Sequence, residues 1–263
     1  MQNELTWTPF RSLLKKEIAR FMRVIVQTIL IPLVNSFLYL LIFGVSLGSA
    51  IQTSGGMPYL SFLIPGIVMM AVLNNAFQNS SSSVITSKFH GDLEDLRMVP
   101  LSPIQVIAAF SLGGLIRGLM VGLVVWAVGQ ALHVYTLGTW LPTHNIFILL
   151  LFLTVGGLAF AQLGITIAFV ARTFDQMSAF GGFILLPLMY LGGVFFSLDQ
   201  LHPFWRYLSQ LNPMLYFING VRYGMLGHSD IAWTQAAYFS IASLAVVCAL
   251  AWRSINKGNY GRW

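Results

Sequence analysis

Six long apolar stretches run through this 263-residue chain, and they constrain its fold more than any other feature. About 20 consecutive apolar residues are enough for a helix to cross the roughly 30 Å hydrocarbon core of a bilayer. Hydrophobic residues make up 57% of the chain and charged residues 8%, whereas ordinary globular domains carry about 25% charged residues. The strict alternation that marks the strands of a membrane barrel does not occur in the sequence. We therefore predict an all-α polytopic membrane protein.

The apolar stretches predict one domain over residues 1–263 with six transmembrane helices. The predicted spans are 24–47, 59–87, 104–131, 146–171, 177–198 and 231–252. An interfacial helix, a short cytoplasmic helix and an outer re-entrant helical hairpin complete the expected fold, over 1–23, 91–99 and 199–230. The first span has an apolar core of about 24 residues, which exceeds the roughly 7–15 of a secretory signal peptide, so we expect it to be retained.

Basic residues indicate the orientation of the spans, because cytoplasmic loops carry an excess of Lys and Arg. Most of the 14 basic residues fall on one side of the predicted arrangement: Arg11, Lys15, Lys16, Arg20, Arg23, Lys88, Arg97, Arg172, Arg253, Lys257 and Arg262. Arg206 and Arg222 fall on the other side, and Arg117 lies within a span. We therefore expect both termini to be cytoplasmic. The net charge of +6 follows from this asymmetry, and no soluble basic face exists that would indicate nucleic-acid binding.

Residue types that support catalysis or metal binding are scattered along the chain. The histidines show no spacing typical of metal ligands: His90, His133, His144, His202 and His228. Serines and acidic residues form no catalytic constellation, and the single Cys248 excludes an intrachain disulfide. We therefore predict no catalytic residue, no metal site and no cofactor held by this chain.

The segment ahead of the first span predicts an amphipathic helix in the membrane interface. Thr8 is a candidate N-cap, and Pro9 suits the first helical turn. Apolar residues recur every three or four positions and share one face: Trp7, Phe10, Leu14, Ile18, Phe21 and Ile25. Basic residues take the other faces, as expected for a helix lying among lipid headgroups. Such a helix is either an anchor alone or an anchor that also touches a cytoplasmic partner.

A polar segment between the second and third spans carries the start and stop signals of a short helix. It holds three of the chain's eight acidic residues. Gly91 ends the preceding span, Asp92 is a candidate N-cap, and Asp95 adds a carboxylate near the positive end of the helix dipole. Pro100 forces the residue before it out of helical geometry, so the helix ends there.

We expect this segment to form about two turns of helix across the base of two spans. Its carboxylates, its arginine, Leu93 and Leu96 should point toward the cytoplasm or along the membrane surface. Ser102 and Pro103 then supply a cap and a first-turn proline for the third span. The alternative is a solvated loop that only turns the chain.

Two motifs resemble those of a known family. Residues 91–97 (GDLEDLR) and 99–103 (VPLSP) resemble the coupling-helix signature G-x-L-E-x-L-R and T-P-L-S-P of type-2 ATP-binding-cassette (ABC) permeases of exporter type. Val99 stands where that signature usually has threonine. Residues 211–216 (LNPMLY) and 220–224 (GVRYG) resemble the family's L-N-P-x-x-Y and L-R motif before the last span. The layout of six spans also matches, so the resemblance covers nearly the whole chain.

The resemblance implies a homodimeric permease that exports an amphiphilic substrate, such as a drug, a lipid or a lipid-linked glycan, across the bacterial inner membrane. Each copy would dock on a separate nucleotide-binding ATPase subunit, present in two copies, which would hold ATP and Mg. This chain lacks the Gly-x-x-x-x-Gly-Lys-Ser/Thr phosphate loop and is therefore not expected to be an enzyme. The coupling residues that the resemblance implies are Gly91, Asp92, Leu93, Glu94, Asp95, Leu96 and Arg97. Membrane lipid is a further expected partner.

The region between the fifth and sixth spans is too apolar for a simple extracellular loop and too short for two more spans. Two short helices broken at Pro213 would dip into the outer leaflet and return, packed against the spans because irregular backbone cannot face lipid. The resemblance implies that this hairpin closes the outer end of the pathway, with Asn212, Pro213, Tyr216 and Arg222 as gate residues. Interfacial anchoring by aromatic side chains is the alternative.

Polar residues inside the predicted spans are candidates for a translocation path. Unsatisfied amides are costly in hydrocarbon, so they should face protein or water. The candidates in the second span are Asn74, Asn75, Gln78 and Asn79. These four residues are equally compatible with lining a path and with packing against neighbouring helices. Arg117 costs at least about 2.5–3.5 kcal/mol at the bilayer centre, and it is either structural or a contact for an anionic headgroup.

The fifth span combines glycines, Pro187 and aromatic side chains, among them Tyr190, the remaining candidate for the path. Glycine permits close helix approach and proline permits a kink, which suits either a dimer seam or a flexible aromatic wall.

A secondary transporter or a channel that works without an ATPase is the competing function. A secondary transporter would carry an intramembrane carboxylate and internal repeats, but Asp175 and Asp199 sit only at span ends and no repeat is visible. A channel would leave the short polar helix unexplained.

Overall fold

The computed structural model of the chain describes residues 2–48, 57–96 and 98–257, which are helical and contain no β-strand. The longer α-helices are α1 (Gln2–Met22), α2 (Ile25–Tyr39), α3 (Tyr59–His90), α5 (Pro103–Leu137), α6 (Ile146–Val170) and α11 (Trp233–Lys257). The shorter ones are α4 (Asp92–Asp95), α7 (Phe174–Phe180), α8 (Leu186–Leu191), α9 (Pro203–Gln210) and α10 (Pro213–Leu226). A π-helical segment over Leu40–Ser46 extends α2, another over Gly181–Leu185 joins α7 to α8, and a 3-10 turn covers Leu198–Gln200.

Six helical stretches in the described parts of the chain are long and apolar enough to cross a membrane. They are Ile25–Ser46, Tyr59–His90, Pro103–Leu137, Ile146–Val170, Phe174–Leu191 and Trp233–Asn256. The predicted fold class, an all-α polytopic membrane protein, is confirmed.

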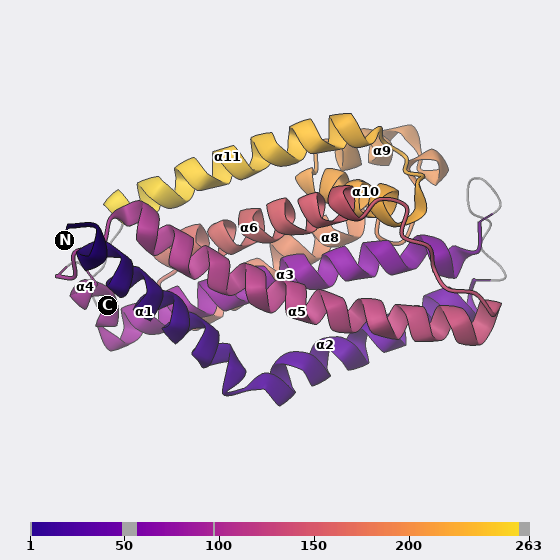
Figure 1. Cartoon of the computed structure of the whole chain (residues 1–263). Helices are drawn as coiled ribbons and strands as arrows, with labels where there is room; N and C mark the ends of the chain where they lie inside the picture. The colour runs from indigo at the N-terminus through magenta and orange to yellow at the C-terminus, as the bar shows by residue number, and fades with distance from the viewer. Residues whose placement is uncertain (1, 49–56, 97, 258–263) are drawn as a thin grey trace.

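The start of α1, the short α4 and the end of α11 lie together at one end of the bundle, here called the α4 end (Figure 1). Helices α9 and α10 lie at the opposite end, here called the α9 end (Figure 1).

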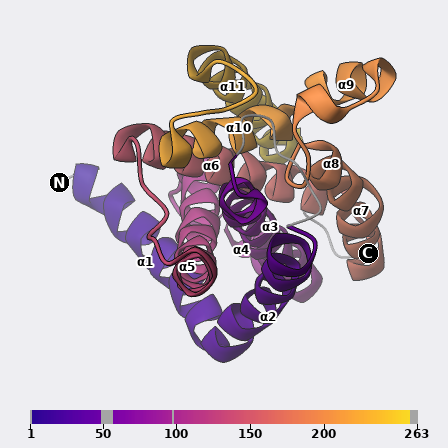
Figure 2. The same ribbon diagram turned by 90° about the vertical axis from the view of Figure 1, so that its right-hand side faces the viewer.

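Helix α3 forms the centre of the bundle. It is buried along most of its length and packs mainly against α5 and α6 (Figure 2). The approach of α5 requires glycine: a Cβ at Gly118 would lie 2.8 Å from the carbonyl oxygen of Val72, and one at Gly114 would lie 2.8 Å from that of Ala76. Small residues of this kind let backbones approach and pack inside a membrane. In contrast to α3, the fifth span is largely uncovered, because only 11% of it is buried within the chain.

Helix α1 does not begin where the sequence signals placed its start. We expected Thr8 to cap the helix and Pro9 to occupy its first turn, but the helix already begins at Gln2 and contains Pro9. Proline disfavours the helical interior without forbidding it. Trp7 and Phe10, which flank Thr8 and this proline in the helix, meet edge to face with ring centroids 5.7 Å apart.

The third and fifth spans depart furthest from their predicted ends. The fifth begins at Phe174 and ends at Leu191 rather than near 198, because the backbone then turns through Gly193 at φ +79°. The third span continues to Leu137, six residues beyond the predicted end, and closes on Gly138 at φ +71°. Positive φ of this size is accessible to glycine at little cost. The apolar pattern located these two spans, whereas the conformation of a glycine decides where each of them stops.

The start of the third span is capped as predicted. Ser102 Oγ accepts a hydrogen bond from the backbone N–H of Gln105 at 3.3 Å, and Gln105 Oε1 accepts one from the Ser102 backbone N–H at 2.9 Å. This reciprocal capping box, with Pro103 in the first turn, fixes where the chain re-enters the bundle after α4.

Candidate functional site

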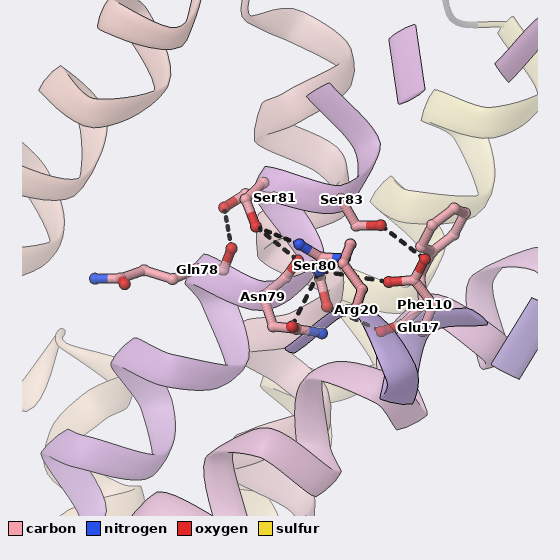
Figure 3. A network of polar contacts seen from close by, with 9 residues as sticks. Glu17, Arg20, Gln78, Asn79, Ser80, Ser81, Ser83 and Phe110 are labelled. Atoms are coloured by element: carbon pink, nitrogen blue, oxygen red, sulfur yellow. Dashed lines mark hydrogen bonds and ion pairs between the residues drawn. The ribbon is translucent and has the colours of Figure 1, made fainter. Parts of the chain in front are cut away.

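A buried polar network joins α1 to the middle of α3 (Figure 3). Arg20 donates from Nη2 to the carbonyl oxygen of Asn79 at 2.6 Å and to Asn79 Oδ1 at 3.0 Å, and from Nη1 to Ser82 Oγ at 3.2 Å. Glu17 lies one turn earlier on α1, where its Oε1 accepts from Ser83 Oγ at 2.8 Å. Its other oxygen, Oε2, lies 3.5 Å from Arg20 Nη2. Part of the polar surface of α3 therefore serves to hold α1.

Glu17 is only 1% exposed because α5 leaves room for it. A Cβ at Gly113 of α5 would lie 2.8 Å from the Cβ of Glu17. Burial raises the pKa of Glu17 above its ordinary value, and the charge of Arg20 offsets part of the rise. From the sequence we expected only apolar residues on the inner face of α1 and did not predict this carboxylate. Leu13 and Phe21, four residues to either side, are both buried, and this spacing was the signal that could have found it.

Another side of α3 lines a cavity of about 540 Å³ between α3, α5 and the fifth span. Gln78 points away from Glu17 and Arg20 (Figure 3). The polar lining comes from Asn74, Gln78, Ser81, Ser82, Arg117 and Ser178. The apolar and glycine lining comes from Phe77, Met177, Gly181, Gly182, Leu185, Leu186 and Met189. Three residues proposed for the path, Asn74, Gln78 and Arg117, are therefore brought together at one cavity.

The other three path candidates do not line this cavity. Asn75 is 5% exposed and donates to the carbonyl oxygen of Ala71 in its own helix at 3.0 Å. Asn79 is fully buried and belongs to the network with α1. The hydroxyl of Tyr190 lies 3.3 Å from that of Tyr39, so it joins the fifth span to α2. For these three residues the contacts are those of helix packing.

Arg117 lies half-buried on α5 with its side chain at the cavity. Its Nε is buried without a hydrogen-bond partner, and none of the ion pairs in the described parts of the chain includes it. The nearby amides bond to each other instead, with Gln78 Nε2 donating to Asn74 Oδ1 at 3.0 Å. The positive charge of Arg20 acts on Arg117 as well. The cavity therefore contains a cation that no described carboxylate neutralises.

Helix α4 is a single turn, Asp92–Asp95, where we predicted two turns. We also expected Asp92 to be its N-cap, but Gly91 takes that position at φ +86° and no side chain caps the helix. Gly91 closes α3 in this left-handed conformation and opens α4 directly, with its carbonyl oxygen accepting from the Glu94 N–H at 3.0 Å. Asp92 is thus already helical, and its side chain cannot reach back as a cap. Arg97 lies outside the described residues.

The apolar side of α4 is built into the bundle. Leu93 is 1% exposed, contrary to our expectation that it would point toward the cytoplasm or the membrane surface. It belongs to the core of the α4 end, with residues of α5, α6 and α11 that include Ile107, Phe110, Ala168, Phe169 and Ile255. Asp92, Glu94 and Asp95 are exposed. Helix α4 therefore has a buried anchor and an acidic outer surface.

Lys88 fixes the last turn of α3 immediately before α4. It is buried, and its Nζ donates to the carbonyl oxygens of Phe169 at 3.1 Å and Ala171 at 3.4 Å. These carbonyls lie at the C-terminal end of α6, where the helix dipole favours a cation. From the sequence, Lys88 was expected only to be one of the basic residues that indicate orientation. Its position shows that α3, α4 and α6 are joined at this end.

The predicted hairpin at the α9 end is present and breaks before Pro213. Asn212 Oδ1 accepts from the Met214 N–H at 3.0 Å and so caps α10, while its Nδ2 donates to the carbonyl oxygen of Leu188 at 2.6 Å. The hydroxyl of Tyr216 donates to the carbonyl oxygen of Gln210 at 2.8 Å. These bonds tie α9 to α10, and α10 to the end of the fifth span.

Arg222 is the deepest charge at the α9 end, with 2% of its surface exposed. Its Nη2 donates to the carbonyl oxygen of Gly193 at 2.7 Å, and its guanidinium lies 3.8 Å above the ring centroid of Phe62 in α3. Nη1 lies 3.9 Å from Asp230 Oδ2, and Asp230 Oδ1 accepts from Ser197 Oγ at 2.7 Å. Asp230, which we did not predict as a site residue, thus joins α10 to the loop after the fifth span.

Comparison with known proteins agrees with this architecture. The sequence profile of the ABC-2 type transporter family matches residues 8–226. The inner membrane transport permease YadH of Escherichia coli K12 is 37% identical over 254 residues, which cover 97% of each chain. Nodulation protein J of Neorhizobium galegae is 23% identical over 197 residues, 74% of this chain and 73% of the relative. With its six apolar helices, this chain is a multi-pass inner membrane transport permease and belongs to the ABC-2 type transporter family.

Proposed function

We propose that this permease works as a homodimer that exports an amphiphilic substrate, driven by two copies of a separate ATPase subunit that binds ATP and Mg. The observation that carries the proposal is the split environment of α4, with Leu93 buried and Glu94 exposed. A helix that only turned the chain would not need one face in the core. The substrate is a drug, a lipid or a lipid-linked glycan, as the family resemblance implies.

Movement of α4 would be transmitted directly into the spans. Gly91 leaves no linker between α3 and α4, and Leu93 packs on the ends of α5, α6 and α11. Lys88 binds the end of α6 one turn before α4. Protein interiors are close-packed and transmit strain, so a force on the outer surface of α4 displaces the ends of several helices together.

The acidic surface of α4 would face the ATPase from the cytoplasm. Asp92, Glu94 and Asp95 carry three exposed negative charges within one helical turn; Asp92 Oδ2 lies 3.6 Å from Lys16 Nζ of α1, whereas Glu94 and Asp95 form no ion pair within the described residues. Opposite charge on a partner would orient the docking, because charge complementarity across an interface sets register and specificity. Basic residues of α1 at the same end, such as Lys15 and Arg11, support a cytoplasmic location for this end.

The hairpin at the α9 end would close the outer end of the path. Asn212 and Tyr216 hold its two helices, with Pro213 at the break, and Arg222 holds α10 on α3 and on the loop after the fifth span. A movement of the fifth span would therefore also move the hairpin. Gating by these residues is supported by that mechanical connection.

A second copy would pack against the fifth span. Phe183 in this span is 83% exposed, and little of the span contacts the rest of its own chain. Packing and shape complementarity drive helix association in membranes, and this span offers the least occupied surface for it.

Reconstitution in sealed vesicles tests the proposal. The permease is inserted with and without its ATPase, and a panel of fluorescent amphiphiles (a dye, an acyl lipid and a lipid-linked glycan) is followed across the bilayer. We expect at least one probe to move only when the ATPase and ATP are both present. Directed movement by the permease alone would contradict the proposal and favour a secondary transporter or a channel.

A further inference from the structure

The cavity beside α3 has two chemically different walls. One wall consists of amides, hydroxyls and the guanidinium of Arg117. The other wall is the fifth span, which presents methionine and leucine side chains, such as Met189 and Leu185, next to two glycines. Its volume of about 540 Å³ lies within the usual range of roughly 300–1,000 Å³ for small-molecule sites. The two walls meet within one cavity, so a ligand that fills it contacts both.

Arg117 is the residue that defines the charge of the ligand. Its Nε is buried and unpartnered, no described carboxylate pairs with it, and the charge of Arg20 acts on it with the same sign. An ionised group without a partner is expensive to hold in a membrane interior, so such residues mark functional sites by default. An anionic group would neutralise Arg117 and accept charge-assisted hydrogen bonds from its planar N–H groups.

The amides next to Arg117 suit the polar part of a lipid. The bond from Gln78 to Asn74 uses one donor and one acceptor, which leaves the amide nitrogen of Asn74 and the amide oxygen of Gln78 for a ligand. These groups match the esters and hydroxyls of a headgroup. The fifth span contributes one hydroxyl, Ser178, to the cavity and no charged side chain that would pair with a second charged end.

We propose that this cavity binds an anionic amphiphile, with its headgroup at Arg117 and its hydrocarbon chain along the fifth span. The inference rests on the proposed export of an amphiphilic substrate and names its class: the headgroup is negatively charged, and the site lies within one chain between α3, α5 and the fifth span. A neutral or cationic amphiphile would leave Arg117 without a counterion.

Lipid titration followed by native mass spectrometry tests the binding directly. The full chain is purified in a non-ionic detergent without ATPase or nucleotide and titrated with phosphatidylglycerol or with phosphatidylcholine of the same acyl chains. We expect the anionic lipid to bind about tenfold more tightly, the size of one charge-assisted contact. Arg117→Gln should abolish this preference and Arg117→Lys should retain most of it. Arg253→Gln, which removes an exposed arginine on α11, should leave it unchanged.

A second variant tests the cavity without touching the charge. A Cβ at Gly182 meets nothing within 4 Å, so Gly182→Leu fits the fold and fills the cavity. We expect it to weaken the binding of both lipids. The inference is overturned if Arg117→Gln keeps the preference for the anionic lipid, or if Gly182→Leu binds both lipids as the unmodified chain does. Inorganic phosphate should not displace the lipid; displacement would show a site for free anions instead.

This experiment separates the inference from the proposed function. Binding is measured without any source of energy, so a chain that binds the anionic lipid but shows no ATP-dependent transport would retain the site and contradict only the proposed export. Conversely, a chain that transports an amphiphile with ATP but shows no Arg117-dependent preference for the anionic lipid would support the proposed export and contradict only this binding site.

Discussion

Leu93 and Glu94 are neighbours in α4 and face opposite surroundings: Leu93 is 1% exposed in the core of the α4 end, and Glu94 is exposed at the surface. Consecutive residues of an α-helix point about 100° apart, so a single turn is enough to separate an anchor from a contact surface. The anchor joins α4 to α5, α6 and α11. The surface remains available to another protein.

Reversing the charge of Glu94 should uncouple the ATPase from transport. Like charges brought together across an interface cost several kcal/mol, so Glu94→Lys should lower ATP-dependent transport by about tenfold or more. Membrane insertion should be unchanged because the side chain is exposed. Transport and ATP hydrolysis in reconstituted vesicles measure the effect.

Asp199→Lys is the matched control, since it reverses an exposed acidic residue at the α9 end. It should leave coupling intact. Normal coupling in Glu94→Lys would remove α4 from the proposed interface.

Removing the anchor of α4 should destabilise the fold. Leu93→Ala leaves a cavity in the α4-end core, and leucine truncations in cores lower the free energy of unfolding by about 2–5 kcal/mol. Leu123→Ala, at a residue of α5 that is 63% exposed, should cost less than about 0.5 kcal/mol. Denaturant titration in detergent compares the two. Equal losses would mean that Leu93 is not the anchor.

The pair formed by Arg222 and Asp230 should behave as one unit. Removing one partner of a buried pair costs about 3–5 kcal/mol, because the other charge is left uncompensated. We expect Arg222→Met and Asp230→Asn each to lower stability, and the double variant to lose less than the sum. A double-mutant cycle on the free energy of unfolding measures the coupling. Purely additive losses would show that the 3.9 Å approach is not an interaction.

The buried Glu17 should make stability depend on pH. Burial raises its folded-state pKa above the ordinary value of 4.5, so the folded protein holds this proton more tightly than the unfolded chain. The resulting stabilisation is fully present below pH 4.5 and is lost as pH rises through the raised pKa. Glu17→Gln stays neutral, so its melting temperature relative to the unmodified protein should increase between pH 4.5 and 7.

The melting temperature of Ser83→Ala is the control for this prediction. It removes the hydrogen bond to Glu17 and keeps the titrating group, so the pH dependence should persist. A constant difference between Glu17→Gln and the unmodified protein across this range would show that burial does not perturb Glu17.

Much of the fold was predictable because its signals are local. Apolar length predicted the spans, Ser102 and Pro103 predicted the capped start of the third span, and Pro213 predicted the break in the hairpin. The spacing of Leu13 and Phe21 could have indicated that Glu17 is buried, but the partners of Glu17 and Lys88, such as Gly113 on α5 and the end of α6, are distant in sequence and were not predictable.

The candidate site shows the same division. Asn74, Gln78 and Arg117 were identified because they are polar residues inside apolar spans. The hydropathy pattern does not show which amides face a cavity and which face a neighbouring helix. Asn75 and Asn79 differ from their neighbours only by about 100° around α3. Because of that rotation, Asn74 and Gln78 line the cavity beside the fifth span, whereas Asn75 and Asn79 take part in helix packing.

The composition of the complex purified from its native membranes tests the central claim most directly. The tagged chain is extracted in mild detergent, and native mass spectrometry weighs the assembly. We predict two copies of the chain with two copies of a nucleotide-binding subunit, and loss of that subunit in Glu94→Lys but not in Asp199→Lys. Recovery of the chain without any nucleotide-binding subunit would contradict the account.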